Sequence, residues 1–277
     1  MSKQRLRWAT VAAVSAVLVV VPAGTAGAAK IITESGSTSV APLATKLARK
    51  YVRRTHHRVG FKIIQGGSDV GIQDVAHGRV SIGNSSRAIK SSDPGGLVFN
   101  HIADDAICVI TNNDNPVQNL TEGQVQAIFG GSARHWNDGN FGSTRGGNTI
   151  DVFVRTPASG TQDAFQTLFM GGKPPAGTPI FSGAKQKASN GLIQQSVQSD
   201  KDGIGYVSEH FAAGVHRVAF KGVPCTLRNA KSGTYSGVRP FSHVTRGAPV
   251  GKVKKYIAWV QHSRKARRIV ATEWVPI

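Results

Sequence analysis

Cysteine, aromatic side chains and acidic residues are all scarce in this chain of 277 residues. It has two cysteines, 7% aromatic residues, and 15 Asp and Glu against 34 Lys and Arg. Two cysteines form at most one disulfide, and neither has the His spacing of a metal site. The sequence leaves open whether Cys108 and Cys225 are bonded or stay as free thiols. Beyond Val21 no apolar run approaches the ~20 residues that span a bilayer, so no membrane helix is expected there.

The excess of basic residues gives a formal net charge of +19 and a sequence pI ≈ 10.5. A basic surface raises the local concentration of anions and favours phosphate-rich polymers, although salt screens this effect over ~8 Å. Nucleic acid is therefore one candidate partner. The low aromatic content and the lack of an aromatic-interleaved recognition motif argue against it. The 40% hydrophobic residues and 32 glycines are typical of a globular α/β protein with many tight turns.

The segment from Met1 to Ala28 has the pattern of an export signal. Lys3, Arg5 and Arg7 precede an apolar run over positions 8–21, and small residues up to Ala28 follow it. The alternative is a membrane anchor, but the run is shorter than the ~20 residues that cross a bilayer. Cleavage after Ala28 would also remove the three positive charges. No cysteine lies nearby to take a lipid, so we predict a secreted, extracytoplasmic protein that is soluble after cleavage.

The rest of the chain repeats a unit made of a strand, a polar turn and a helix. The predicted units cover residues 31–33, 34–39 and 40–54; then 59–64, 65–69 and 70–76; then a strand at 80–83 that ends in 84–87; and finally 150–155, 156–161 and 162–170. Strands that alternate with helices at short spacing predict a mostly parallel sheet. Ligand sites in such sheets lie beyond the carboxyl ends of the strands, where these polar turns fall.

Other elements follow from periodicity and punctuation. We expect strands at 106–110 and 203–208, a helix at 120–129 with Thr121 as its N-cap, a loop at 171–178, and a long helix from about 251 to 271. The long helix is apolar on one face and carries seven Lys and Arg residues on the others. These basic faces are expected either to be solvated or to contact a cell-envelope polyanion.

Three of the polar turns could bind an anion together. The start of a helix exposes backbone N–H donors at the positive end of its dipole, and Gly, Ser and Thr there admit an anion and add hydroxyl donors. The turns are 36–39, 67–69 and 159–161. Any one of them is read more simply as an ordinary N-cap. Arg155 lies four residues before the third turn and supplies a charged fork that suits a tetrahedral oxyanion, so the set predicts an oxyanion cage.

The order of these motifs resembles one family closely. The matching segments are Gly36-Ser37-Thr38-Ser39-Val40-Ala41-Pro42-Leu43, Gly67-Ser68-Asp69-Val70-Gly71-Ile72, Ile82-Gly83-Asn84-Ser85-Ser86-Arg87, Ala127-Ile128-Phe129-Gly130 with Trp136, Arg155-Thr156-Pro157-Ala158-Ser159-Gly160-Thr161 and Gly203-Ile204-Gly205-Tyr206-Val207. They are similar to the phosphate-binding proteins of bacterial ABC phosphate importers. The resemblance implies a two-lobed α/β fold of the periplasmic-binding-protein-like type II, with the ligand cleft between the lobes. The segments 29–110 and 210–277 would form lobe 1, and the segment 111–209 would form lobe 2.

The resemblance also implies the residues that hold the ligand. Carried over by motif position, they are Thr38, Ser39, Ser68, Ser86, Arg155, Ser159, Gly160 and Thr161. Several phosphate binders place Asp where this chain has Ser86, to accept the proton of monohydrogen phosphate. Such an acceptor discriminates against fully ionised sulfate, which would leave it unpaired. Asp69 is a candidate for this role, and its simpler interpretation is a capping carboxylate.

The resemblance implies binding of inorganic phosphate rather than catalysis, without a cofactor, by a monomer that serves the permease subunits of an importer. A hydrolase is disfavoured because the segment around Ser68 lacks the second glycine of a nucleophile elbow. No carboxylate and His set has metal-ligand spacing. Three alternatives stay open: a sensor or scavenger of phosphate, a binder of another oxyanion, or a basic protein that binds envelope polyanions or nucleic acid.

Overall fold

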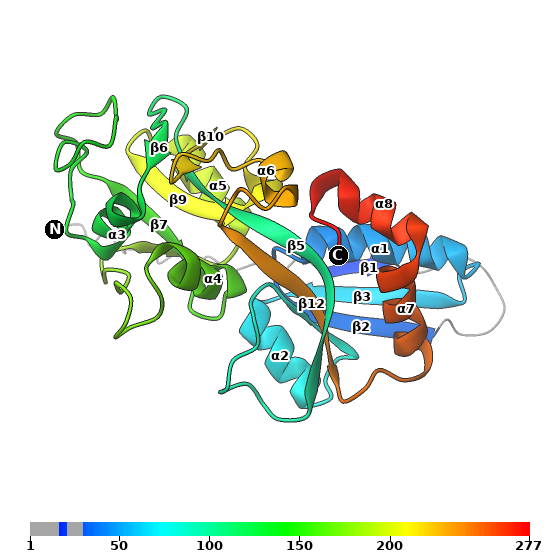
Figure 1. Cartoon of the computed structure of the whole chain (residues 1–277). Helices are drawn as coiled ribbons and strands as arrows, with labels where there is room; N and C mark the ends of the chain where they lie inside the picture. Colours follow the sequence, from blue (N-terminus) through cyan, green and yellow to red (C-terminus); the bar gives the residue numbers. More distant parts are fainter. Residues whose placement is uncertain (1–16, 21–29) are drawn as a thin grey trace, which may run out of the picture.

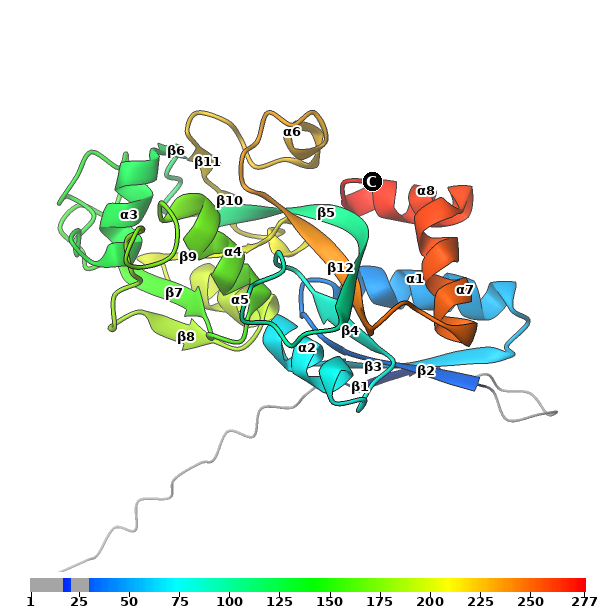
Figure 2. The same cartoon turned by 60° about the horizontal axis from the view of Figure 1, so that its bottom comes forward.

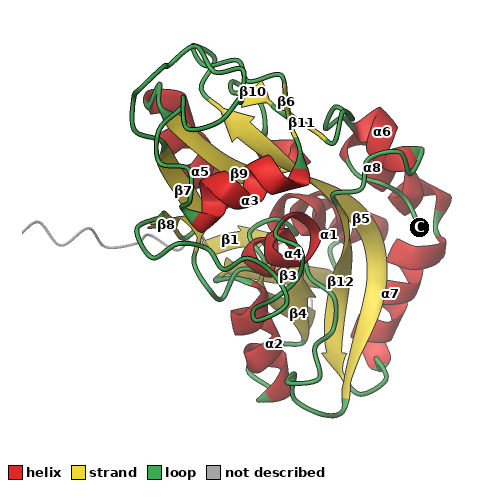
Figure 3. Cartoon of the chain, turned by 60° about the vertical axis from the view of Figure 1, so that its left-hand side comes forward, coloured by secondary structure: helices red, strands yellow, loops and turns green. Residues whose placement is uncertain are grey.

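The computed structural model describes residues 17–20 and 30–277. Two parts, each built of helices and strands, are joined by two long strands, β5 (Leu97–Thr111) and β12 (Val238–Arg246), that pair antiparallel with each other (Figures 1 and 3). The predicted export signal lies outside the described residues except for β1 (Val17–Val20), which pairs antiparallel with β3 (Val59–Gln65). The fold is the two-lobed α/β arrangement that the motifs imply.

Lobe 1 contains the first two predicted units. Its parallel strands are β3, β2 (Lys30–Gly36) and β4 (Ile82–Ser85), and β12 pairs antiparallel with β4. The helices of this lobe are α1 (Ala41–Arg54), α2 (Ser68–Ala76), α7 (Gly251–His262) and α8 (Arg264–Glu273). Helix α1 forms because its apolar residues recur on one side, which packs on the sheet, while Arg53 and Arg54 lie in its last turn.

Lobe 2 is built around the strand that ends at Arg155 and the helix that follows the next turn. Its parallel strands are β8 (Lys185–Lys187), β7 (Asp151–Arg155) and β9 (Gly203–Ser208), and β9 pairs antiparallel with β5. Around them lie α3 (Glu122–Gly130), α4 (Gly160–Phe169), α5 (Asn190–Ser199), α6 (Leu227–Lys231), the 3-10 turn η1 (Glu209–Phe211) and the short strands β6 (Asn119–Leu120), β10 (His216–Arg217) and β11 (Ala219–Phe220). Thr121 caps α3 as predicted, in a capping box with Gln124.

The buried side chains form two large clusters, one in each lobe. One cluster draws on residues 32–103 and 241–274, and the other on residues 106–235. The segment 210–235, which the sequence placed in lobe 1, therefore contributes its apolar side chains to the core of lobe 2. The reason is that the chain returns from lobe 2 to lobe 1 along β12. The pairing of β12 with β5 begins at Val238, so the second crossing between the lobes lies near that residue. We therefore propose that the boundary between the lobes lies between residues 103 and 106 and again between residues 235 and 241.

Three further predictions need correction or completion. The helix expected at 251–271 is two helices, because Ser263 has an extended backbone and its hydroxyl accepts from the N–H of Lys265 to cap α8. The strand expected at 106–110 is the end of the fifteen-residue β5. Cys108 and Cys225, which the sequence left open, form a disulfide in lobe 2. Across residues 17–20 and 30–277, no helix combines the length and apolar character that crossing a bilayer requires.

Candidate functional site

Three helix starts converge where the lobes meet, and they come from the three predicted turns. Helix α1 follows Ser37-Thr38-Ser39, α2 begins at Ser68, and α4 begins at Gly160. The Ser39 and Thr161 hydroxyls lie 2.9 Å apart, although they belong to different lobes. Ser37 Oγ donates to Ser86 Oγ at 2.8 Å. The turns that were separate in the sequence therefore form one site.

Glycines let these segments approach so closely. Gly36 has a φ of 130° in the left-handed region, and a Cβ there would lie 2.4 Å from the carbonyl oxygen of Asn84. Gly160 stands directly against the hydroxyls of lobe 1: a Cβ on it would lie 2.3 Å from Ser68 Oγ and 2.8 Å from Ser86 Oγ. Only a glycine at the start of α4 leaves its backbone this near to the opposite lobe.

The predicted site residues are almost entirely buried. The six that carry a hydroxyl expose at most 6% of their surface: Thr38, Ser39, Ser68, Ser86, Ser159 and Thr161. Ser68 Oγ accepts from the backbone N–H of Ser86 at 3.0 Å, and Ser159 Oγ caps α4 by accepting from the N–H groups of Thr161 and Gln162. Buried hydroxyls that point at one another with backbone N–H donors around them are suited to an acceptor-rich ligand such as an oxyanion.

Arg155 ends β7 and carries its charge into this cluster. It is 2% exposed, and its Nη2 donates to Thr38 Oγ1 at 3.1 Å and to the Ala188 carbonyl at 2.8 Å. Within the described residues its Nη1 has no hydrogen-bond partner. Burial lowers the pKa of Arg155 to about 10, and the nearby Arg239 guanidinium adds to the shift. A buried cation with an unpaired donor is costly on its own, so the position favours an anion.

Arg239 is a second guanidinium in the site, and the sequence analysis missed it. It lies on β12, where Nη2 donates to Ser39 Oγ at 3.0 Å and Nη1 to the Ser86 carbonyl at 3.1 Å. Asp105, on β5, holds the guanidinium by accepting from Nε at 3.2 Å and from Nη2 at 2.9 Å. Burial raises the pKa of Asp105 and lowers that of Arg239, and their mutual bonds oppose both shifts.

A sequence signal for Arg239 did exist. Side chains alternate between the two faces of a strand, and Arg239 shares its buried face with Phe241. A charged residue at a core-facing position is rarely buried unless it has a partner or a ligand. Asn190, at the start of α5, is a second missed residue: its Nδ2 donates to Thr38 Oγ1 at 3.2 Å and to Ser39 Oγ at 2.8 Å.

Asp69 lies at the edge of this cluster rather than inside it. Its carboxylate accepts from Arg87 Nε at 2.8 Å and lies 3.8 Å from Lys90 Nζ, and its side chain is 37% exposed. Arg87 also binds Asp93, which holds the guanidinium in place. Asp69 thus has basic partners of its own. The hydroxyl of Ser86, rather than a carboxylate, lies between Ser68 of the second turn and Gly160 of the third.

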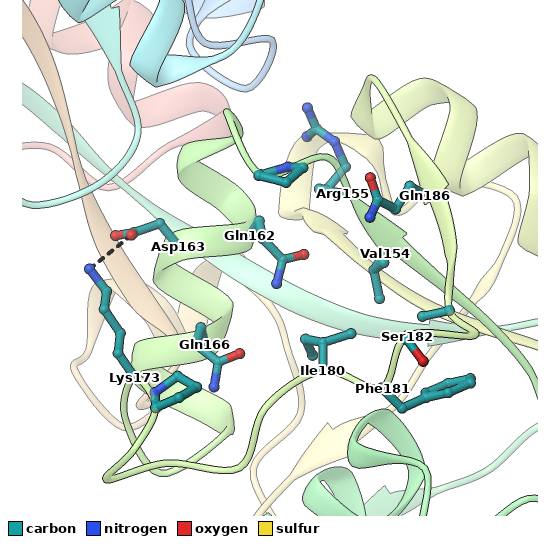
Figure 4. Close-up of a pocket in the computed structure, with 13 residues that line it drawn as sticks. Val154, Arg155, Gln162, Asp163, Gln166, Lys173, Ile180, Phe181, Ser182 and Gln186 are labelled. Atoms are coloured by element: carbon teal, nitrogen blue, oxygen red, sulfur yellow. Dashed lines mark ion pairs between the residues drawn. The ribbon is translucent and has the colours of Figure 1, made fainter.

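A separate pocket of about 420 Å³ lies beside the site in lobe 2 (Figure 4). Its walls include the apolar side chains of Val154, Ile180 and Phe181, and the Arg155 guanidinium points away from the latter two. Asp163 stands at its rim, paired with Lys173 at 2.9 Å. Arg155 borders this pocket as well, but its Nη2 donates to Thr38 in the cluster of helix starts, so we assign the oxyanion chemistry to that cluster.

The cluster therefore provides hydroxyl and amide donors, two guanidinium groups and one carboxylate that is already bound to Arg239. Such a set can hold a tetrahedral oxyanion from several sides. Among the residues that the structure describes, no group of three His, Cys, Asp or Glu could hold a metal ion.

Comparison with known proteins agrees with this chemistry. A model of the PBP superfamily domain matches residues 21–264. The phosphate-binding protein PstS of Bacillus subtilis is 24% identical over 255 residues, which cover 89% of this chain and 80% of that protein. PstS of Staphylococcus haemolyticus is 29% identical over 184 residues, 64% of this chain. That match spans only 55% of the staphylococcal protein.

Two solved structures are similar over most of the chain. A phosphate ABC transporter substrate-binding protein described from Clostridium perfringens, with bound phosphate, has a TM-score of 0.81 and 30% identity, covering 90% of this chain and all of that one. An ABC-type phosphate transport receptor from Vibrio cholerae has a TM-score of 0.71 and 27% identity, with coverage of 90% and 100%. The chain belongs to the PBP superfamily, and its relatives confirm the resemblance to phosphate-binding proteins that its motifs indicated.

Proposed function

We propose that this protein binds one inorganic phosphate ion in the cleft between its lobes. The observation that carries the proposal is the buried Arg155, whose Nη1 has no partner within residues 17–20 and 30–277 and whose other nitrogens already bind Thr38 and backbone carbonyls. A phosphate oxygen accepting from Nη1 would both neutralise the charge and satisfy the donor.

The remaining contacts follow from the positions of the helix starts. The proposed ligand-binding residues are those named from the sequence, together with the two found in the structure: Thr38, Ser39, Ser68, Ser86, Arg155, Ser159, Gly160, Thr161, Asn190 and Arg239. Their hydroxyl and N–H groups would replace the hydration shell of the ion, and lobe closure would exclude water and strengthen each contact.

The role in the cell is proposed from the relatives. PstS proteins are named for phosphate binding, and the two solved relatives are described as parts of phosphate ABC transporters. We propose that this chain acts outside the cytoplasm, without catalysis, as a monomer that delivers phosphate to the permease subunits of such an importer. Sensing or scavenging of phosphate uses the same site, so the ligand and the transport role need separate tests.

Selection of phosphate over sulfate depends on a carboxylate that accepts the proton of the ion. Asp105 is linked to the hydroxyl cluster through Arg239, from which it accepts, and it also accepts from Ser208 Oγ at 2.8 Å. Asp69 is the alternative acceptor and is paired with Arg87. If Asp69 selects the protonated ion, Asp69→Asn will raise the affinity for sulfate relative to phosphate. An unchanged ratio would remove Asp69 from the proposal.

Isothermal titration tests the ligand. The chain beginning at Ala29 is freed of bound anion by partial unfolding and dialysis, refolded, and titrated with phosphate and then with sulfate at physiological salt. Tight one-to-one binding of phosphate with a weak sulfate response is the expected result. Binding of neither ion would overturn the proposed function. Equal binding of both would mean that the site accepts tetrahedral oxyanions in general rather than phosphate in particular.

A further inference from the structure

A basic groove lies between α1 and α8, on the part of lobe 1 distant from α3 and β7. Helices α1 and α8 pack side by side there (Figure 2). The groove has a volume of about 620 Å³. Arg49, Lys50 and Arg53 line it from α1, and Lys265 and Arg268 line it from α8. We call these five residues the basic groove; four of them are exposed and Lys50 is half-buried.

Within residues 17–20 and 30–277 the five cations have no acidic partners, whereas most acidic residues of this protein are paired with a base. Thirteen of the 15 acidic residues lie within 4.0 Å of a Lys, Arg or His. Among the described residues, none of those acids lies within that distance of the basic groove. Lys46 also lines this pocket, but it is already paired with Glu273 and is not counted among the five. Arg49 and Arg53 also repel each other, because residues four apart are neighbours on a helix. The charge of the groove is thus left uncompensated within the fold.

The basic groove continues toward the anion site. A second pocket, of about 360 Å³, runs along α1 and shares Lys46 and Arg49 with the groove. Its lining also includes Thr38, which accepts from Arg155 in the anion site. The basic groove therefore adjoins a pocket that reaches Thr38, one of the residues proposed to hold phosphate.

We propose that the basic groove binds linear inorganic polyphosphate. Cations on two facing helices enclose a thin, densely charged chain better than a flat bilayer, which would touch only the rims. Arg49, Arg53 and Arg268 can each form paired hydrogen bonds with phosphate oxygens. No aromatic side chain lines the groove, so it has no platform for the bases of a nucleic acid. This binding goes beyond the proposed capture of orthophosphate and would hold the protein beside a phosphate polymer.

The test measures binding of size-fractionated polyphosphate to the chain beginning at Ala29, at low salt and at a fourfold higher salt concentration. If five cations contact the polymer as they would a single-stranded nucleic acid, affinity should fall roughly 100-fold over this range. The triple variant Arg49→Gln, Arg53→Gln, Arg268→Gln should bind polyphosphate more weakly than the wild type. Its affinity should fall less than about tenfold over the same rise in salt. The matched control is the triple variant Lys62→Gln, Arg228→Gln, Arg246→Gln. It removes three exposed cations that lie outside the basic groove and have no acidic partner among the described residues.

The proposal predicts that the control keeps wild-type affinity for polyphosphate. Equal loss in both triple variants would overturn the assignment to the groove, because only net charge would then matter. Equally tight binding of single-stranded DNA with the same number of phosphates would overturn the assignment to polyphosphate. Arg155→Met separates this inference from the proposed function: it should lose orthophosphate and keep polyphosphate. Wild-type orthophosphate binding by the groove variant checks that its fold is intact.

Discussion

Replacing Arg155 by methionine should separate ligand binding from stability. The Arg155 side chain is buried and has no acidic partner in the described part of the chain, and a pKa lowered from 12.5 to about 10 corresponds to a burial cost of about 3 kcal/mol. Methionine fills much of the same volume without a charge. Its cost is the loss of the hydrogen bonds to Thr38 and to two carbonyls, each worth about 1 kcal/mol or somewhat more. The relief of the burial cost stabilises the variant, and the loss of these hydrogen bonds destabilises it.

The free energy of unfolding without phosphate should therefore change by less than about 2 kcal/mol in Arg155→Met. Phosphate binding should respond very differently, because the variant leaves a dianion in a buried site with one guanidinium fewer. Breaking a buried charge pair at one partner costs roughly 2–5 kcal/mol, which is a loss of about 30-fold to several thousandfold in affinity. A large loss of affinity with little change in stability is the signature of a residue placed for the ligand.

Titration calorimetry measures the affinity, and thermal unfolding with and without phosphate measures the linked stability. Phosphate should raise the melting temperature of the wild type and leave that of Arg155→Met unchanged. Arg145→Met is the matched control, since it removes an arginine of the same lobe that is paired with Asp202 at 2.8 Å, away from the helix starts. A dissociation constant of Arg155→Met within threefold of wild type would refute the role of Arg155.

Three more perturbations follow from the same structure. Gly160→Ala places a Cβ 2.3 Å from a lobe 1 hydroxyl, and the overpacking should weaken phosphate binding by about 1–3 kcal/mol; unchanged calorimetric affinity would contradict the contact. Burial raises the pKa of Glu34 from 4.5 to about 7, so the folded state holds a proton that the unfolded state releases. The free energy of unfolding should then fall by about 3 kcal/mol between pH 4.5 and 7, and urea titrations of Glu34→Gln should lack this fall. Replacing Cys108 and Cys225 by alanine should lower the unfolding free energy by about 2–5 kcal/mol, as urea unfolding would show, and an equal midpoint would contradict a structural disulfide.

The sequence predicted the part of the site that is encoded locally. Each of the three turns is a short polar run with Gly and Ser between a strand and a helix, so its place at the carboxyl end of a parallel strand follows from the order of elements alone. The geometry of one turn, such as Ser159 capping α4, needs no distant residue. This is why the local pattern identifies the turns that contain Thr38, Ser68 and Thr161, while the family resemblance implies which of their side chains bind.

The residues that were missed depend on long-range register. Arg239 meets Ser39 across 200 positions of sequence, and no local pattern specifies which residue of β5 faces it. The two-helix C-terminus was also missed, because the apolar spacing continues through Ser263 while one extended residue breaks the helix. The disulfide likewise joins residues 117 positions apart. For Arg239 and the disulfide, tertiary pairing rather than local propensity determines the outcome.

The position of Arg239 also links the anion site to the two strands that join the lobes. Arg239 and Asp105 are cross-strand partners in the register of β12 and β5, the two strands that pass between the lobes. From this one pair, the guanidinium reaches Ser39 and Ser86 in lobe 1, while the carboxylate accepts from Ser208 in lobe 2. A change in the twist of the two strands would move the guanidinium and both sets of hydroxyls together. The ion pair is therefore placed to transmit ligand contact to the connection between the lobes.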